Sequence, residues 1–236
     1  MEDPKAGLFA TSQLLESFAR TAGALHESIP YTNDQLGVVQ LRFNAFDVQS
    51  EMRKNAPYDL VLRYTRTMAE VMARRPGAQH IGMIGLGGGS LPKYAYRKFP
   101  ASKISVAEIN PEVIGLRKKF HVPDNDHRFS VLCEDGAEFV SRFKDEFDLL
   151  LVDGYDRSGQ PPQLCSLRFY RDCHRALAPD GLLIVNICAN HQLIDRMQRC
   201  LFDQVDLEDD DEKCANTIVV AHKTTIGPIR VKRTVG

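Results

Sequence analysis

The sequence predicts an α/β fold in which helices cover both faces of a parallel sheet. From residue 77 onward, strand-like and helix-like segments alternate five times. The strand-like segments are continuously apolar, as in Leu149–Val152 and Leu182–Val185, and such runs are typical of strands that are buried on both faces. The first strand-like segment ends in glycines that lead into a helical pattern. A glycine turn at this place is typical of α/β sheets that bind ligands.

The elements of this sheet follow from the hydrophobic pattern of residues 77–236. Apolar runs of strand length give the strands, and apolar residues three or four apart give the helices. Pro179, Asp180 and Gly181 end the helix before the fifth strand. The acidic run Asp206–Glu212 is predicted to be a solvated loop. The predicted strands are His80–Gly85, Lys103–Ile109, Phe129–Cys133, Phe147–Val152, Leu182–Ile187 and Asn216–His222, and the predicted helices are Leu91–Phe99, Pro111–Phe120, Ala137–Phe143, Leu164–Leu177 and Gln192–Phe202.

The residues before this sheet predict a smaller N-terminal unit made of helices and a β-hairpin. The rhythm of the sequence changes near Arg75–Ala78, where a basic helix end meets Pro-Gly. We therefore expect two domains, residues 1–76 and residues 77–236. The predicted elements of the first are a helix at Leu8–Leu25, turns at Pro30, Asn33, Asp34 and Gly37, strands at Val38–Phe43 and Phe46–Met52, and a helix at Pro57–Arg74.

Composition and charge narrow the class of protein. The chain has 236 residues with 30 Lys and Arg against 31 Asp and Glu, for a formal net charge of -1. Such a balance gives no global field for nucleic acid or for an anionic membrane. No apolar run approaches the roughly 20 residues of a membrane span, and no secretory signal is visible. The six cysteines form no C-x-x-C pair, so we expect a cytoplasmic protein with reduced thiols and no metal.

The first strand runs into a glycine-rich turn, Gly85-Leu86-Gly87-Gly88-Gly89-Ser90. Glycines at such a turn let a ligand approach the backbone closely. Glu108 ends the second strand about 20 residues later, where an acidic residue meets a ribose hydroxyl in sheets of this kind. Either feature alone fits a tight turn or an ordinary strand-end carboxylate. Together they favour a nucleoside ligand, with nicotinamide and adenosylmethionine both open at this point.

Carboxylates also follow the third and fourth strands. Asp135, before Gly136, could accept a hydrogen bond from an adenine amino group, cap the next helix, or do both through different oxygens. Asp153 and Asp156 stand three residues apart after the fourth strand. Such a pair can hold a cationic substrate in a partly desolvated site, although Asp-Gly is also common in turns. Because the other acidic residues precede them at the same sheet edge, we favour the functional interpretation.

With these residues the sequence resembles the spermidine synthase (aminopropyltransferase) family over roughly Asp47 to Leu183. The resemblance implies a Rossmann-like, seven-stranded methyltransferase-type sheet behind a small N-terminal β-rich domain. The segments that carry it are Gly87-Gly88-Gly89, Glu108-Ile109-Asn110, Glu134-Asp135-Gly136-Ala137-Glu138-Phe139, Asp153-Gly154-Tyr155-Asp156, Phe169-Tyr170 and Leu177-Ala178-Pro179-Asp180-Gly181, with Asp47-Val48-Gln49 and Tyr64 before them.

The resemblance implies an aminopropyl transfer from decarboxylated S-adenosylmethionine to a small-molecule amine, with methylthioadenosine as the leaving product. Glu108 would bind the ribose, Asp135 the adenine, and Gln49 the nucleoside or its propyl arm. Asp156 would be the general base and Asp153 would hold the donor's amino group. The full expected set is Asp156 and Asp153 as catalytic residues, Gln49, Gly85, Gly87, Gly89, Ser90, Glu108, Asp135 and Gly136 around the donor, and Tyr64, Tyr155 and Gln160 around the amine.

Two departures from the family pattern keep alternatives open. Ser90 stands where the family carries an aspartate that grips the donor's free amine, and Asn186–Gln192 lacks the family's proline- and tyrosine-rich stretch. Ser90 favours an adenosylmethionine-dependent methyltransferase that uses the intact donor. The missing stretch favours a non-catalytic nucleoside-binding protein. Because members of the family commonly dimerise, we expect a homodimer.

Overall fold

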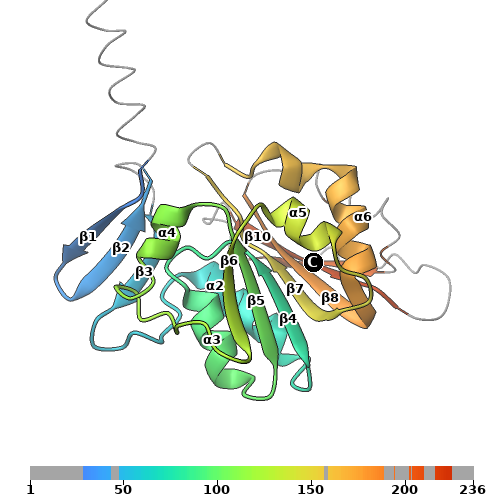
Figure 1. Cartoon of the computed structure of the whole chain (residues 1–236), viewed down its shortest axis with the longest axis horizontal. Helices are drawn as coiled ribbons and strands as arrows, with labels where there is room; N and C mark the ends of the chain where they lie inside the picture. Colours follow the sequence, from blue (N-terminus) through green and yellow to red (C-terminus); the bar gives the residue numbers. More distant parts are fainter. Residues whose placement is uncertain are drawn as a thin grey trace, which may run out of the picture.

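A computed structural model describes residues 29–43, 48–156, 159–188, 194, 202, 204–209 and 216–224 of the chain, and Figure 1 shows their arrangement. The helices predicted at Leu8–Leu25 and Gln192–Phe202 lie outside these residues or almost entirely so. The described elements are β1 (Tyr31–Gln35), β2 (Val38–Arg42), β3 (Val48–Arg53), α2 (Arg63–Ala73), β4 (His80–Ile84), α3 (Ser90–Lys98), β5 (Lys103–Glu108), α4 (Pro111–Gly115), β6 (Phe129–Cys133), α5 (Gly136–Ser141), β7 (Phe147–Val152), the 3₁₀ helix η1 (Pro162–Cys165), α6 (Leu167–Ala176), β8 (Leu177–Cys188), β9 (Gln204–Asp209) and β10 (Asn216–His222).

The larger sheet has seven strands in the order β6-β5-β4-β7-β8-β10-β9. The first five are parallel to one another, whereas β10 is antiparallel to both β8 and β9. The predicted α/β fold with a seven-stranded sheet is therefore confirmed, and the sheet is mixed. The strand order reverses between β4 and β7, the place in such sheets where ligands bind beyond the carboxyl ends of the strands.

Helices cover both faces of this sheet, which explains the continuously apolar strands. On β7, Leu149 and Leu151 pack into one core with α2 and α3, and Leu150 and Val152 pack into the other with α5 and α6 (Figure 1). Successive strand residues point to opposite faces, so a strand that is buried on both sides has no polar face.

A smaller antiparallel sheet, β1-β2-β3, lies at one end of the molecule (Figure 1). The predicted pairing of its second and third strands is confirmed. The turns predicted around Asn33 and Asp34 are wrong, because both residues lie in β1, which pairs with β2. The chain reverses instead at Leu36 and Gly37, whose φ angles of 51° and 79° suit a two-residue hairpin turn.

Two predictions for the last strands are also corrected. Residues 206–209 of the acidic run belong to β9, which pairs with β10, and are not a solvated loop. β9 is an edge strand with one neighbouring strand, so it is less buried than a central strand and does not need a continuous apolar run. β8 starts at Leu177, before Pro179, Asp180 and Gly181, which were predicted to separate the helix from this strand. Its pairing with β7 shifts register in this region, where Asp180 has a φ of 60°.

The predicted domain boundary near residue 76 stays a prediction. α2 precedes that boundary but packs on β8 and β10 of the larger sheet. Its Met68, Val71 and Met72 are fully buried in the same core as α3. The helix predicted over Pro57–Arg74 begins only at Arg63.

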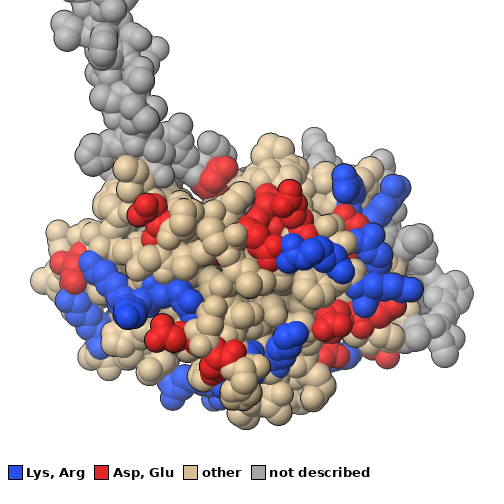
Figure 2. Space-filling model, in the orientation of Figure 1, with Lys and Arg blue, Asp and Glu red and all other residues tan. Residues whose placement is uncertain are grey.

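Charges of both signs are interspersed on the face shown in Figure 2. None of the described helices combines the length and apolar character that a bilayer crossing needs. Cys133, Cys165 and Cys173 form no disulfide bond. Among the described residues, no three His, Cys, Asp or Glu side chains gather to hold a metal ion.

Lys93 of α3 is a buried cation that joins three parts of the chain. Only 2% of the residue is exposed. Its Nζ donates to the carbonyl oxygens of Pro57 and Phe120 at 2.7 and 2.8 Å and lies 3.4 Å from Sδ of Met52 on β3. Burial lowers the pKa of Lys93 to about 8 from its ordinary 10.5. The charged form is therefore held less favourably in the folded protein than in the unfolded chain.

Lys93→Met should change how stability depends on pH. Between pH 8 and 10.5 the unfolded chain binds more protons at Lys93 than the folded protein, so the wild-type free energy of unfolding gains about 2–3 kcal/mol from this residue as the pH rises. The variant lacks this gain. Urea unfolding of both proteins at pH 7, 8, 9 and 10 measures it, and parallel pH profiles would contradict the expected effect.

Candidate functional site

A cleft of about 890 Å³ lies between the carboxyl edge of the large sheet and the small sheet. Strands β4, β5, β7 and β8 contribute the residues at or just beyond their carboxyl ends, and β2 and β3 contribute the opposite wall. Of the predicted site residues, all but Gly89 line this cleft. They are Gln49, Tyr64, Gly85, Gly87, Ser90, Glu108, Asp135, Gly136, Asp153, Tyr155, Asp156 and Gln160.

The glycine turn after β4 forms the floor of the cleft. Gly85 has a φ of 94°, and a Cβ there would overlap the backbone carbonyl of Asp153. Gly89 has a φ of 68° and caps α3, with Val122 packed where its side chain would be. Gly88 packs in the same way against Ser50 of β3. The turn therefore needs glycine for backbone packing as well as for space beside a ligand.

Glu108 ends β5 with its carboxylate turned back toward the glycine turn. Its Oε2 accepts a hydrogen bond from the backbone N–H of Leu86 at 2.9 Å, and its Oε1 accepts one from Asn110, also at 2.9 Å. These bonds fix the carboxylate at the edge of the cleft. Each oxygen has a further lone pair that can accept a ribose hydroxyl.

Asp135 performs the capping role weighed for it above. Its Oδ1 accepts the backbone N–H groups of Ala137 and Glu138 at the start of α5, at 2.7 and 3.1 Å. Its Oδ2 accepts a 3.0 Å hydrogen bond from Nε2 of Gln163. An adenine amino group would therefore meet Oδ2 together with Gln163, a residue that sequence reasoning did not select.

Asp153, directly after β7, is held by two side chains from other elements. Tyr64 of α2 donates its hydroxyl to Oδ2 at 3.0 Å, and Asn186 of β8 donates Nδ2 to Oδ1 at 2.9 Å. Loss of contact with bulk water raises the pKa of the Asp153 carboxyl, against a smaller lowering by these two hydrogen bonds. Burial and the neighbouring Asp153 charge raise the pKa of Tyr64 well above its ordinary value, so its hydroxyl stays a donor.

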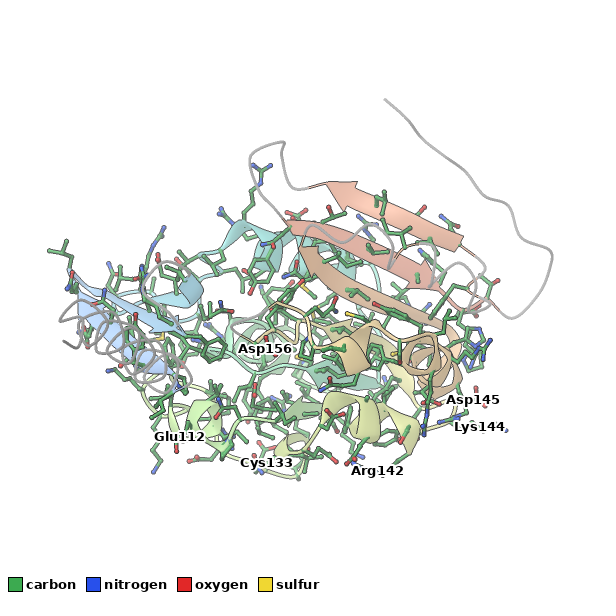
Figure 3. All side chains as sticks on the ribbon, turned by 90° about the horizontal axis from the view of Figure 1, so that it is seen from above. Glu112, Cys133, Arg142, Lys144, Asp145 and Asp156 are labelled. Atoms are coloured by element: carbon green, nitrogen blue, oxygen red, sulfur yellow. The ribbon has the colours of Figure 1, made fainter. Side chains whose placement is uncertain are left out.

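Asp156 stands on the loop that follows Asp153. Its backbone exchanges two hydrogen bonds with Gly159, at 2.9 and 3.2 Å. In the view of Figure 3 Asp156 lies in the middle of the molecule, whereas Glu112, Cys133 and Arg142 lie toward its border. The exposed position of Asp156 at the cleft suits a base that exchanges protons with substrate and solvent.

Two neighbouring side chains complete this wall. The hydroxyl of Tyr155 donates to the backbone carbonyl of Asn186 at 2.8 Å. Both polar atoms of the Gln160 side chain are buried at the cleft without a hydrogen-bond partner. A buried amide that is unsatisfied is costly to the fold and points to a bound ligand.

Sequence reasoning missed Asn186 as well as Gln163. Asn186 was detectable as a polar residue inside the apolar run of β8. Gln163 offered no such signal, because it lies in the short 3₁₀ helix η1 and only the fold brings it to Asp135.

The cleft has a strongly one-sided charge. Its ionisable side chains are four carboxylates and two tyrosines, and none of the described residues that line it is Lys, Arg or His. Such a cleft attracts cations. The carboxylates are Glu108, Asp135, Asp153 and Asp156.

The comparisons with known proteins agree with this geometry. The spermine/spermidine synthase domain matches residues 62–205. The chain belongs to the spermine/spermidine synthase family. Within this family, a polyamine aminopropyltransferase of Neisseria meningitidis serogroup A is 34% identical over 156 residues, which cover 65% of this chain and 59% of the relative. One of Chromobacterium violaceum is 32% identical over 175 residues, with 73% and 67% covered.

The fold is shared with solved structures. A probable spermidine synthase from Corynebacterium glutamicum superposes with a TM-score of 0.70 at 19% identity, covering 84% of this chain and 78% of that one. The family match spans the glycine turn, Glu108, Asp135 and the two aspartates after β7. The matched region spans 59% of the length of the Neisseria relative.

Gly85→Ala should destabilise the protein by about 3–5 kcal/mol, because a Cβ would overlap the Asp153 carbonyl and the residue would need a φ of 94°. Gly115→Ala is the matched control, because nothing lies near its added Cβ and α4 ends there. The control should change stability by less than about 1 kcal/mol. Urea unfolding compares them, and equal losses would contradict the assigned contact.

Proposed function

We propose that the protein transfers an aminopropyl group from decarboxylated S-adenosylmethionine to a small-molecule amine. The observation that carries the proposal is the anionic cleft, in which Asp153 and Asp156 follow β7 beside the glycine turn. A sulfonium donor without its carboxylate and a protonated amine are both cations, and this cleft attracts cations. Membership of the spermine/spermidine synthase family supports the same reaction class.

The donor's nucleoside would lie along the edge formed by β4, β5 and α5. Glu108 would accept the ribose hydroxyls, and Asp135 would accept the adenine amino group beside Gln163. The glycine turn and Gly136 let the ligand approach the backbone, and Gln49 of β3 closes the opposite side. Asp153 would pair with the ammonium at the end of the aminopropyl arm.

The acceptor amine would lie between Asp156, Tyr64, Tyr155 and Gln160. An alkylamine with a pKa near ~10.4 arrives protonated at neutral pH, so Asp156 takes one proton before attack. The nitrogen lone pair then forms a bond to the propyl carbon next to sulfur. The carbon–sulfur bond breaks, its electron pair stays on sulfur, and neutral methylthioadenosine leaves. The second proton of the new ammonium leaves to solvent or stays on the product.

A second candidate is methyl transfer from intact S-adenosylmethionine, and Ser90 is the observation that favours it. Ser90 lines the cleft at the first turn of α3, where an aspartate would repel the carboxylate of the intact donor. Helix N-terminal N–H groups also favour an anion at this place. The two donors differ by this carboxylate, so direct binding distinguishes the two functions.

We also propose that the protein is a cytoplasmic homodimer. Ile29, Tyr31 and Leu36 are exposed apolar residues at the small sheet, and exposed apolar side chains are candidates for an interface. Cys133, Cys165 and Cys173 form no disulfide bond, which suits a reducing compartment.

Asp156→Asn should lower kcat for aminopropyl transfer by about 10²–10⁴-fold, because the amide cannot accept the amine proton. Donor affinity should change little. Glu112→Gln, an exposed change on α4 away from the cleft, is the control and should keep full activity. Methylthioadenosine release from decarboxylated donor and an amine panel measures kcat. Unchanged turnover in Asp156→Asn would contradict the general-base assignment.

Ser90→Asp should strengthen the preference for the decarboxylated donor. A carboxylate at this position attracts the terminal ammonium and repels the carboxylate of the intact donor, so the affinity ratio should rise about 10-fold or more. Calorimetric titration of both donors into wild type and variant measures the ratio. A wild-type protein that prefers the intact donor would replace aminopropyl transfer with methyl transfer as the better proposal.

A further inference from the structure

Asn186 is a buried polar residue in a strand that is otherwise apolar. It is 3% exposed, and its β8 neighbours Val185 and Ile187 are 0% and 1% exposed. Nonetheless it lines the cleft. A buried polar side chain in such a strand needs an explanation beyond core packing.

The side-chain hydrogen bond of Asn186 is directed at the cleft. Its Nδ2 donates to Oδ1 of Asp153 at 2.9 Å, and its Oδ1 is buried without a partner. The hydroxyl of Tyr155 donates to its backbone carbonyl at 2.8 Å. An amide with one unsatisfied end stabilises the fold poorly, and an apolar side chain of the same size would avoid that cost. The contact with Asp153 is therefore the reason for an amide at this position.

Asn186 and Tyr64 hold the Asp153 carboxylate with two neutral hydrogen-bond donors. They donate to its two oxygens from opposite elements, β8 and α2. Both donors are neutral, so they favour the ionised carboxylate without cancelling its charge. A Lys or Arg at position 186 would hold the carboxylate equally well but would occupy it with a positive charge. The remaining lone pairs of Asp153 stay available for a cationic ligand.

Other ionisable groups around the cleft do not supply this support. Glu108 ends β5, Asp135 precedes α5, and Tyr155 and Asp156 share the loop of Asp153. The nearby carboxylates would oppose ionisation of Asp153 if they acted on it. The neutral donors are thus the groups that keep it charged.

Resting on the proposed function, we propose that Asn186 is a positioning residue for the donor's terminal ammonium. Its amide keeps the Asp153 carboxylate oriented and ionised, so that this one carboxylate can hold the ammonium where Ser90 supplies no acid. Asn186 thereby contributes to donor choice without touching the reacting atoms.

Direct titration of Asp153 tests the positioning claim in the protein without ligand. Carbon-13 NMR of labelled aspartate carboxyls, with Asp153→Asn for assignment, gives the midpoint. Asn186→Leu removes the donor at similar side-chain size and should raise the Asp153 midpoint by about one pH unit. Asn216→Leu is the matched control, because Asn216 lines the same cleft from β10 but is not a donor to Asp153. It should leave the midpoint unchanged.

Binding of two ligands tests the role of the ammonium. Decarboxylated S-adenosylmethionine carries the ammonium, whereas methylthioadenosine carries the same nucleoside without it. Asn186→Leu should weaken the binding of decarboxylated S-adenosylmethionine about 10-fold or more, and the binding of methylthioadenosine less than about 2-fold. The difference should widen below the raised midpoint, where Asp153 is protonated. Asn186→Val replaces Asn186→Leu if the leucine variant does not fold.

The outcomes distinguish failure of the role of Asn186 from failure of aminopropyl transfer itself. Equal weakening of both ligands, or an unshifted Asp153 midpoint, overturns the inference while leaving aminopropyl transfer intact. A wild-type protein that binds methylthioadenosine but not the decarboxylated donor overturns both. Selective weakening together with the shifted midpoint supports both.

Discussion

The close contact between the glycine turn and the backbone of Asp153 is the constraint on which the site depends. β4 and β7 pair in parallel, and the N–H of Asp153 donates to the carbonyl of Ile84 at 2.9 Å. The residue after β4 therefore lies directly against the residue after β7, and only glycine fits at position 85. The glycine turn and the carboxylates that follow β7 thus keep one fixed separation, which is set by main-chain packing rather than by flexible side chains.

The cleft gathers four carboxylates, and no Lys, Arg or His is among the described residues that line it. Each of three carboxylates has its place fixed by neutral hydrogen-bond donors, so its charge is not cancelled. A catalytic site for cationic substrates needs this combination, because an internal ion pair would compete with the substrate. The donors are the backbone N–H groups of Leu86 and Asn110 for Glu108, those of Ala137 and Glu138 and the amide of Gln163 for Asp135, and Tyr64 and Asn186 for Asp153.

The sequence was sufficient for the parts of the fold that burial alone determines. β6, β7 and β10 have the predicted bounds, because apolar residues make up most of each strand. β1 and β9 were missed, because each lies at the edge of a sheet and is rich in polar residues. Residues on glycine turns and strand ends were brought together as expected. Asn186 and Gln163 were not selected, because their partners follow from side-chain contacts between elements, which spacing along the chain does not encode.

The buried ammonium of Lys93 has a consequence for how the molecule opens. Its Nζ contacts Met52 of β3 and donates to the carbonyls of Pro57, which follows β3, and of Phe120, so one side chain of α3 links the small sheet to two other segments. Local opening of β3 and of the first turns of α3 is then one cooperative event. We therefore expect amide protons of the two segments to exchange with solvent through the same opening, so that the wall of the cleft and the helix after its glycine turn behave as one exchange unit.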